Sequence, residues 1–189
     1  MKPTQRTFVA VELAPANRAA AEKLIARLQA TSADVKWVEP ENLHLTLKFL
    51  GEVPTREIPK VCAAVERGTD QVEPFELQIV GAGAFPRIER PRTLWLGTRG
   101  GTEAMIALHG HIEKALGKLG FRKEQRRFHP HLTIGRVRGG GAGETQLAEA
   151  LAECADYDAG KLIVEEVAIV SSQLGREGPS YTILGRAKL

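Results

Sequence analysis

The tripeptide His-x-Thr occurs twice in this chain, as His44-Leu45-Thr46 and as His131-Leu132-Thr133, and each copy closes the same order of elements. A strand-like segment comes first, a long helical segment follows, and the tripeptide ends the unit. From Phe8 to the first histidine there are 36 positions, and from Leu94 to the second there are 37. The match predicts an internal duplication that produces two similar lobes, with the tripeptides facing each other across a groove.

Hydrophobic periodicity predicts the remaining elements. Alternating apolar and polar residues, rich in β-branched and aromatic types, indicate strands at 7–13, 43–50, 75–84, 93–98, 131–137, 161–171 and 180–188. Apolar residues at helical spacing indicate helices at 18–30, 54–67, 102–119 and 144–154. Several connections are too short for parallel crossovers. We therefore predict an α+β fold of two lobes related by a pseudo-two-fold axis, each a mainly antiparallel sheet with helices packed on the outside, and an active-site groove between them.

The length and composition fit a single domain over residues 1–189. Hydrophobic residues make up 43% of the chain and charged residues 26%, which is ordinary for a globular protein with a sizeable core. No apolar run approaches the length of a membrane span, and the N-terminus lacks the apolar core of a signal peptide. We expect a cytoplasmic protein that does not contact membranes, and a monomer, because the two lobes can bury each other.

The two tripeptides suggest a specific chemistry. Alternate residues of a strand project from one face, so each histidine points with its threonine while the leucine points into the core. An imidazole pKa of about 6.5 allows one histidine to remove a proton from an attacking water while the other protonates the departing alkoxide. Threonine hydroxyls can stabilise the non-bridging oxygens. The pattern predicts a phosphodiesterase without metal or other cofactor, with His44 and His131 as catalytic residues and Thr46 and Thr133 as phosphate-binding residues.

The segments around the tripeptides, ENLHLTLKFLG at 41–51 and FHPHLTIGR at 128–136, closely resemble the paired motifs of the two-histidine phosphoesterases. Among these they are most similar to the RNA 2′,3′-cyclic phosphodiesterases, first named 2′-5′ RNA ligases. The resemblance extends to RTFVAV at 6–11 and LWLG at 94–97, and so spans nearly the whole chain. It implies opening of an RNA terminal 2′,3′-cyclic phosphate to a 2′-phosphate, with His44 as proton donor and His131 as proton acceptor. It also implies that the reverse direction, 2′-5′ joining of RNA ends, is open to the chain.

Charge and aromatic residues near the tripeptides provide candidates for substrate binding. Seven basic residues and one acid lie between positions 118 and 138, an excess that suits a polyanion, although basic runs also occur on ordinary solvated surfaces. Arg126 and Arg127 are candidates for holding the RNA backbone, and Arg136 is a candidate phosphate ligand or a surface residue. The resemblance suggests an aromatic contact with the base, for which Phe49 and Phe8 are candidates. By simple alternation Phe49 faces away from the first histidine, so core packing is its default interpretation.

Other interpretations remain open. A zinc site formed by His44, His129 and His131 would make the protein a metal-dependent phosphoesterase, although no cysteine or carboxylate stands beside them. A nucleotide- or RNA-binding module without turnover would keep the groove, but binding alone does not require two titratable groups at matched positions. His109 and His111 look like a metal pair, yet residues i and i+2 of a helix do not face one way, so we expect both on the helix surface.

Overall fold

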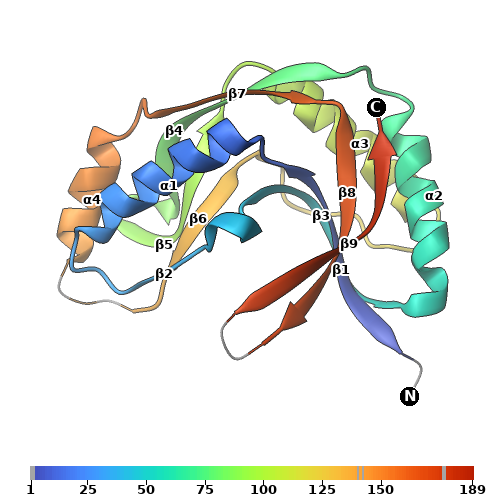
Figure 1. The fold of residues 1–189 in the computed structure, drawn as a ribbon, viewed down its shortest axis with the longest axis horizontal. Coiled ribbons are helices and arrows are strands. Elements are labelled where there is room, and N and C mark those ends of the chain that lie inside the picture. The colour runs from blue at the N-terminus through green and yellow to red at the C-terminus, as the bar shows by residue number, and fades with distance from the viewer. Residues whose placement is uncertain (1–2, 140, 142, 176–177) are drawn as a thin grey trace.

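The computed structural model describes residues 3–139, 141, 143–175 and 178–189. Within these residues, nine strands form one antiparallel sheet and four α-helices pack against it (Figure 1). The strands are β1 (Thr4–Glu12), β2 (Val35–Trp37), β3 (His44–Pro54), β4 (Phe75–Arg87), β5 (Arg90–Thr98), β6 (Leu132–Val137), β7 (Asp158–Val164), β8 (Glu166–Leu174) and β9 (Pro179–Lys188). The helices are α1 (Pro15–Gln29), α2 (Ile58–Thr69), α3 (Thr102–Gly117) and α4 (Glu144–Glu153), with short 3₁₀ turns at Pro40–Asn42 and Thr55–Glu57.

The two His-x-Thr strands meet at the centre of the sheet. The strand order is β7-β4-β5-β6-β3-β1-β8-β9, and β2 pairs with β6 outside this path. β3 and β6 are joined by one residue pair, Leu45 with Leu132, which are the middle residues of the two tripeptides. Three further strands continue on each side of this central pair, so the sheet has the symmetric halves that the repeated order of elements predicts. The duplication that would explain this symmetry stays a prediction.

The helices pack as two pairs, and each pair combines a helix from the first half of the chain with one from the second half. α1 follows β1 in the chain but packs against β7 and α4, whereas α3 follows β5 but packs against α2 and also contacts β3 and β4. Figure 1 shows α1 and α4 at one end of the molecule and α2 and α3 at the other. The lobes are therefore built from interleaved parts of the chain. No helix in the described residues is long and apolar enough to cross a membrane.

Alternation in the central strands decides which face of the sheet the helices cover. Leu45 and Leu132 are completely buried, whereas the histidine and threonine on either side of each leucine are partly exposed. The helices present apolar side chains at helical spacing to this face, such as Leu24 and Leu28 of α1 and Leu108 of α3. Burying a side chain of this size stabilises the fold by about 1.5–3 kcal/mol. The opposite face stays open and carries the histidines.

Two parts of the predicted order of elements are wrong. The strand predicted at 161–171 is two strands, β7 and β8, which are separated by Glu165 alone yet lie in opposite halves of the sheet. The sheet must therefore curl until its two ends approach each other. The adjacent glutamates Glu165 and Glu166 interrupt the apolar pattern at this corner, and the predicted strand ran through them. β2 was not predicted, because three residues in a polar stretch are too few for a periodicity to appear.

Candidate active site

Both candidate catalytic histidines are held by the backbone two residues upstream. Nδ1 of His44 lies 2.7 Å from the carbonyl oxygen of Asn42, and Nδ1 of His131 lies 2.7 Å from the carbonyl oxygen of His129. Because a carbonyl oxygen can only accept, Nδ1 carries the proton and donates it in each ring. Nε2 is then the atom of each imidazole that can exchange a proton with a substrate.

The register of the central strands brings the four tripeptide side chains together. With Leu45 opposite Leu132, antiparallel pairing places His44 across from Thr133 and Thr46 across from His131. The histidines then occupy diagonal positions whose backbones are about 7–8 Å apart, which leaves room for a phosphate between the rings. His44 and both threonines line one cavity, here called the His44 cavity. His131 lines a second, the His131 cavity, which shares Thr46 and Phe49 with the first.

His44 has aromatic neighbours. Its ring stacks on Phe8 with 4.7 Å between the ring centroids and meets Tyr181 edge-on at 5.4 Å. Phe8 is only 3% exposed, so it supports the imidazole rather than facing the His44 cavity, and its position gives the predicted base contact no support. Burial lowers the pKa of His44 below its usual value, against the hydrogen bond to the Asn42 carbonyl, which raises that pKa.

His131 has charged neighbours. Phe85 meets its ring edge-on at 5.1 Å, and Arg136 and His129 lie close enough to act on its charge. Burial is the main cause that lowers the pKa of His131 below its usual value. The hydrogen bond to the His129 carbonyl raises this pKa, while the charges of Arg136 and His129 lower it further.

Phe49 faces the cleft, and the prediction that it packs in the core is wrong. That prediction assumed unbroken alternation along β3, but the register of β3 with β1 shifts at Leu47. This bulge reverses the alternation, so Leu47 and Lys48 are both buried and Phe49 is 64% exposed. Phe49 lines both cavities. Its contact with a base stays a prediction, now with a suitable position.

The three candidate arginines all reach the cleft, but on different sides. Arg126 and Arg127 line the His131 cavity together with His129. Arg136 lines the His44 cavity, and its Nη1 donates to the hydroxyl of Thr93 at 3.2 Å. All three arginines are exposed. Positive charge is therefore available on both sides of the reacting centre.

For three aromatic rings around the cleft, the sequence patterns gave either no prediction or a wrong position. Trp37 of β2 lines the His44 cavity and packs over Gly135 of β6, where a Cβ would lie 3.0 Å from its indole. Alternation within a strand says nothing of this contact. Tyr181 reaches His44 only through the order of β1, β8 and β9 in the sheet. His109 is partly buried and stacks on Phe128 at 4.0 Å, so its predicted surface position is wrong.

The zinc interpretation gains no support from the geometry. The residues that the structure describes contain no group of three or more His, Cys, Asp or Glu side chains placed to bind a metal ion. His44, His129 and His131 therefore do not form a three-ligand site in this part of the chain.

Comparisons with known proteins identify the family of this chain. Residues 15–176 match the family described as the 2′-5′ RNA ligase superfamily. The RNA 2′,3′-cyclic phosphodiesterase of Methanothermobacter thermautotrophicus is 38% identical over 94% of this chain and 95% of its own length. The protein of the same name from Aeropyrum pernix is 35% identical over 84% of this chain and 88% of its own.

Solved structures show the same fold over nearly the whole chain. TT0787 of Thermus thermophilus superposes with a TM-score of 0.81 at 28% identity over 97% of both chains. Escherichia coli LigT complexed with 3′-AMP superposes with a TM-score of 0.76 at 26% identity over 99% of both chains. Sequence and structure agree, and this chain belongs to the 2′-5′ RNA ligase superfamily.

Proposed function

We propose that this protein opens the 2′,3′-cyclic phosphate at an RNA end to a 2′-phosphate by general acid–base catalysis. The observation that carries the proposal is the meeting of two His-x-Thr strands at Leu45 and Leu132, with each imidazole oriented by a carbonyl. The names of the relatives support the substrate, and the complex of Escherichia coli LigT with 3′-AMP supports a nucleotide ligand.

The proposed reaction is one displacement at phosphorus. Nε2 of His131 accepts a proton from water while the water oxygen bonds to phosphorus, and the bond from phosphorus to O3′ breaks on the opposite side. Nε2 of His44 donates its proton to O3′, so the product carries a 3′-hydroxyl and a 2′-phosphate. The histidines end with exchanged protonation states and return to their starting states through solvent.

The surroundings of the two histidines support this order of acid and base. The imidazolium form of His44 is stabilised by the face of Phe8, on which the ring stacks. The imidazolium form of His131 is destabilised by the charges of Arg136 and His129. Burial lowers the pKa of both groups, and beyond this shared effect the ring face favours His44 as proton donor and the cations favour His131 as acceptor.

The remaining residues of the cleft bind the substrate in this proposal. The hydroxyls of Thr46 and Thr133 donate to the non-bridging oxygens, where preorganised donors are most effective. Arg136 adds charge beside the reacting phosphate, and Arg126 and Arg127 bind further phosphates, so affinity for RNA ends falls as salt rises. The exposed ring of Phe49 stacks on a base.

Product analysis tests the proposal directly. The protein is incubated with 2′,3′-cyclic AMP or with RNA ending in a cyclic phosphate, in excess chelator, and 2′- and 3′-phosphates are separated. Formation of the 2′-phosphate supports the proposal, and formation of the 3′-phosphate would mean that O2′ leaves instead. Loss of turnover in chelator would favour a metal-dependent phosphoesterase. Salt-sensitive RNA binding without turnover would favour a binding module.

The same groups also serve 2′-5′ joining of RNA ends, in which an RNA hydroxyl replaces the attacking water. Hydrolysis is the main reaction in our proposal, carried out by a monomer in the cytoplasm. Supplying a 5′-hydroxyl RNA in the assay above shows how much substrate goes to each outcome.

A further inference from the structure

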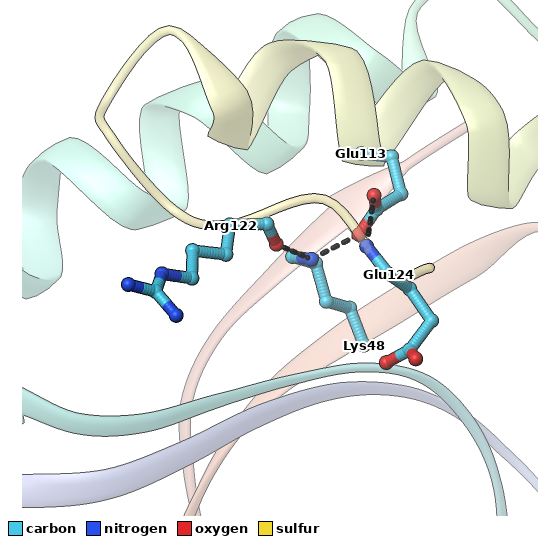
Figure 2. Close-up of polar contacts among 4 residues, drawn as sticks. All are labelled: Lys48, Glu113, Arg122 and Glu124. Atoms are coloured by element: carbon cyan, nitrogen blue, oxygen red, sulfur yellow. Dashed lines mark hydrogen bonds and ion pairs between the residues drawn. The ribbon is translucent and has the colours of Figure 1, made fainter. Parts of the chain in front are cut away.

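A buried ion pair lies beside the cleft, between Lys48 of β3 and Glu113 of α3 (Figure 2). The two side chains are only 7% and 5% exposed. Nζ of Lys48 also donates to the carbonyl oxygen of Arg122 at 2.9 Å, and the backbone N–H of Glu124 donates to the second carboxylate oxygen of Glu113 at 3.1 Å. Figure 2 shows the ammonium between the carboxylate and the Arg122 carbonyl. The pair thus holds two backbone points of the segment that joins α3 to β6.

That segment has few other attachments. Residues 122–130 contain no helix or strand, and among the described residues no backbone–backbone hydrogen bond involves them. Phe128 stacks on His109, and the carbonyl of His129 accepts from the ring of His131. Arg126 and Arg127 lie between these contacts and the two points held by the ion pair. The direction in which both arginines face therefore depends on the pair.

Stability alone is a poor reason for such a pair. The loss of hydration on burial offsets most of the attraction between the charges, and apolar replacement of buried pairs is often neutral or stabilising. Burial acts to raise the pKa of Glu113, but the bonds from Lys48 and from the Glu124 N–H outweigh it, so this pKa lies below its usual value. The carboxylate therefore stays charged, and both charges are used in directed bonds to the segment.

We propose that Lys48 and Glu113 are positioning residues that hold residues 122–130 so that Arg126 and Arg127 meet RNA phosphates beyond the reacting one. They thereby give the enzyme a preference for RNA ends over cyclic mononucleotides. This inference rests on the proposed function. The ligand is a single-stranded polynucleotide, whose phosphates bind arginine through charge-assisted hydrogen bonds. A cyclic mononucleotide carries only the reacting phosphate and gains nothing from the two arginines.

The double variant Lys48→Met/Glu113→Leu tests the proposal, because it fills the same space without directed bonds. Its kcat and KM are measured on 2′,3′-cyclic AMP and on a short RNA with a cyclic phosphate end. We expect kcat/KM on RNA to fall about tenfold more than on the mononucleotide, mainly through KM. The slope of log affinity against log salt should become shallower by about 0.7 for each phosphate that the arginines no longer bind. The single variant Lys48→Arg keeps the cation and its donors, and its RNA KM should stay within about threefold of the wild-type value.

Removal of the arginines separates positioning from a general structural role. In an Arg126→Ala/Arg127→Ala background, replacing the ion pair should change the RNA KM by less than about twofold, since the groups that it positions are gone. Equal losses on both substrates, or losses that multiply in the combined variant, would overturn the proposal. If the double variant does not fold, the nearly isosteric Glu113→Gln takes its place. If wild-type protein turns over neither substrate, the proposed function fails, and RNA binding by fluorescence anisotropy still tests the positioning role.

Discussion

His44 and His131 share one local geometry but differ in the stacked ring and the charges around it. Each ring donates Nδ1–H to a carbonyl two residues upstream at 2.7 Å. The neighbours of His44 are the rings of Phe8 and Tyr181, whereas charge acts on His131 from Arg136 and His129. A ring face favours an imidazolium and nearby cations disfavour one. In our proposal the motif therefore supplies two equivalent groups, and their surroundings distinguish the acid from the base.

Replacement of either histidine should have the largest effect. His44→Ala and His131→Ala are each expected to lower kcat on 2′,3′-cyclic AMP by about 10²–10⁴-fold, since each removes one proton transfer. The double variant should lose little more activity than the less active of the two single variants, because the two groups act in one step.

A substrate with a better leaving group distinguishes the two variants. The nitrophenolate released from bis(p-nitrophenyl) phosphate needs no protonation, so His44→Ala should lose much less activity on it than His131→Ala. The release of nitrophenolate is followed by absorbance. A smaller loss for His131→Ala would reverse the assignment of acid and base.

On the buried face of β3 and β6, the middle leucines of the two tripeptides should contribute equally to the stability of the fold. Leu45 and Leu132 pair with each other and are both 0% exposed. Leu45→Ala and Leu132→Ala should each lower the free energy of unfolding by about 2–5 kcal/mol, because each removes apolar packing and leaves a cavity. Because the two sites touch, the double variant should not be additive. Urea unfolding measures all three, with exposed Ile163→Ala as the control, expected within about 0.5 kcal/mol of wild type. A difference of more than about 2 kcal/mol between the two single variants would contradict the symmetry of the core.

The sequence was sufficient to predict the features that depend on the residues of a single strand. The alternation that sends Leu45 and Leu132 inward and the histidines outward is a property of each strand by itself. Phe49 was misplaced because a bulge at Leu47 depends on the pairing of β3 with β1. Tyr181 was missed because its contact with His44 depends on strand order, which local periodicity does not contain. The parts of the cleft that are equal in both copies were thus predictable, and so were the arginines near the second tripeptide. The aromatic contacts that depend on strand pairing and strand order were not.

The pH dependence of kcat/KM reports the two histidines in the free enzyme. In the proposed reaction the active form has His44 protonated and His131 neutral, and burial lowers the pKa of both groups. As pH rises through the pKa of His44 the acid is lost, and as pH falls through the pKa of His131 the base is lost. The optimum should therefore lie below about pH 6.5, with kcat/KM on 2′,3′-cyclic AMP falling about tenfold per pH unit on the alkaline side.

Two variants should move opposite limbs of this pH profile, and their effects are the smallest that we expect. Phe8→Leu removes the ring face from His44, which lowers the pKa of the acid and moves the alkaline limb down by about half a pH unit. Arg136→Met removes a cation near His131, which raises the pKa of the base and moves the acidic limb up by a similar amount. If Phe8→Leu moves the acidic limb instead, His44 has the lower pKa of the two histidines, which would count against its assignment as the proton donor.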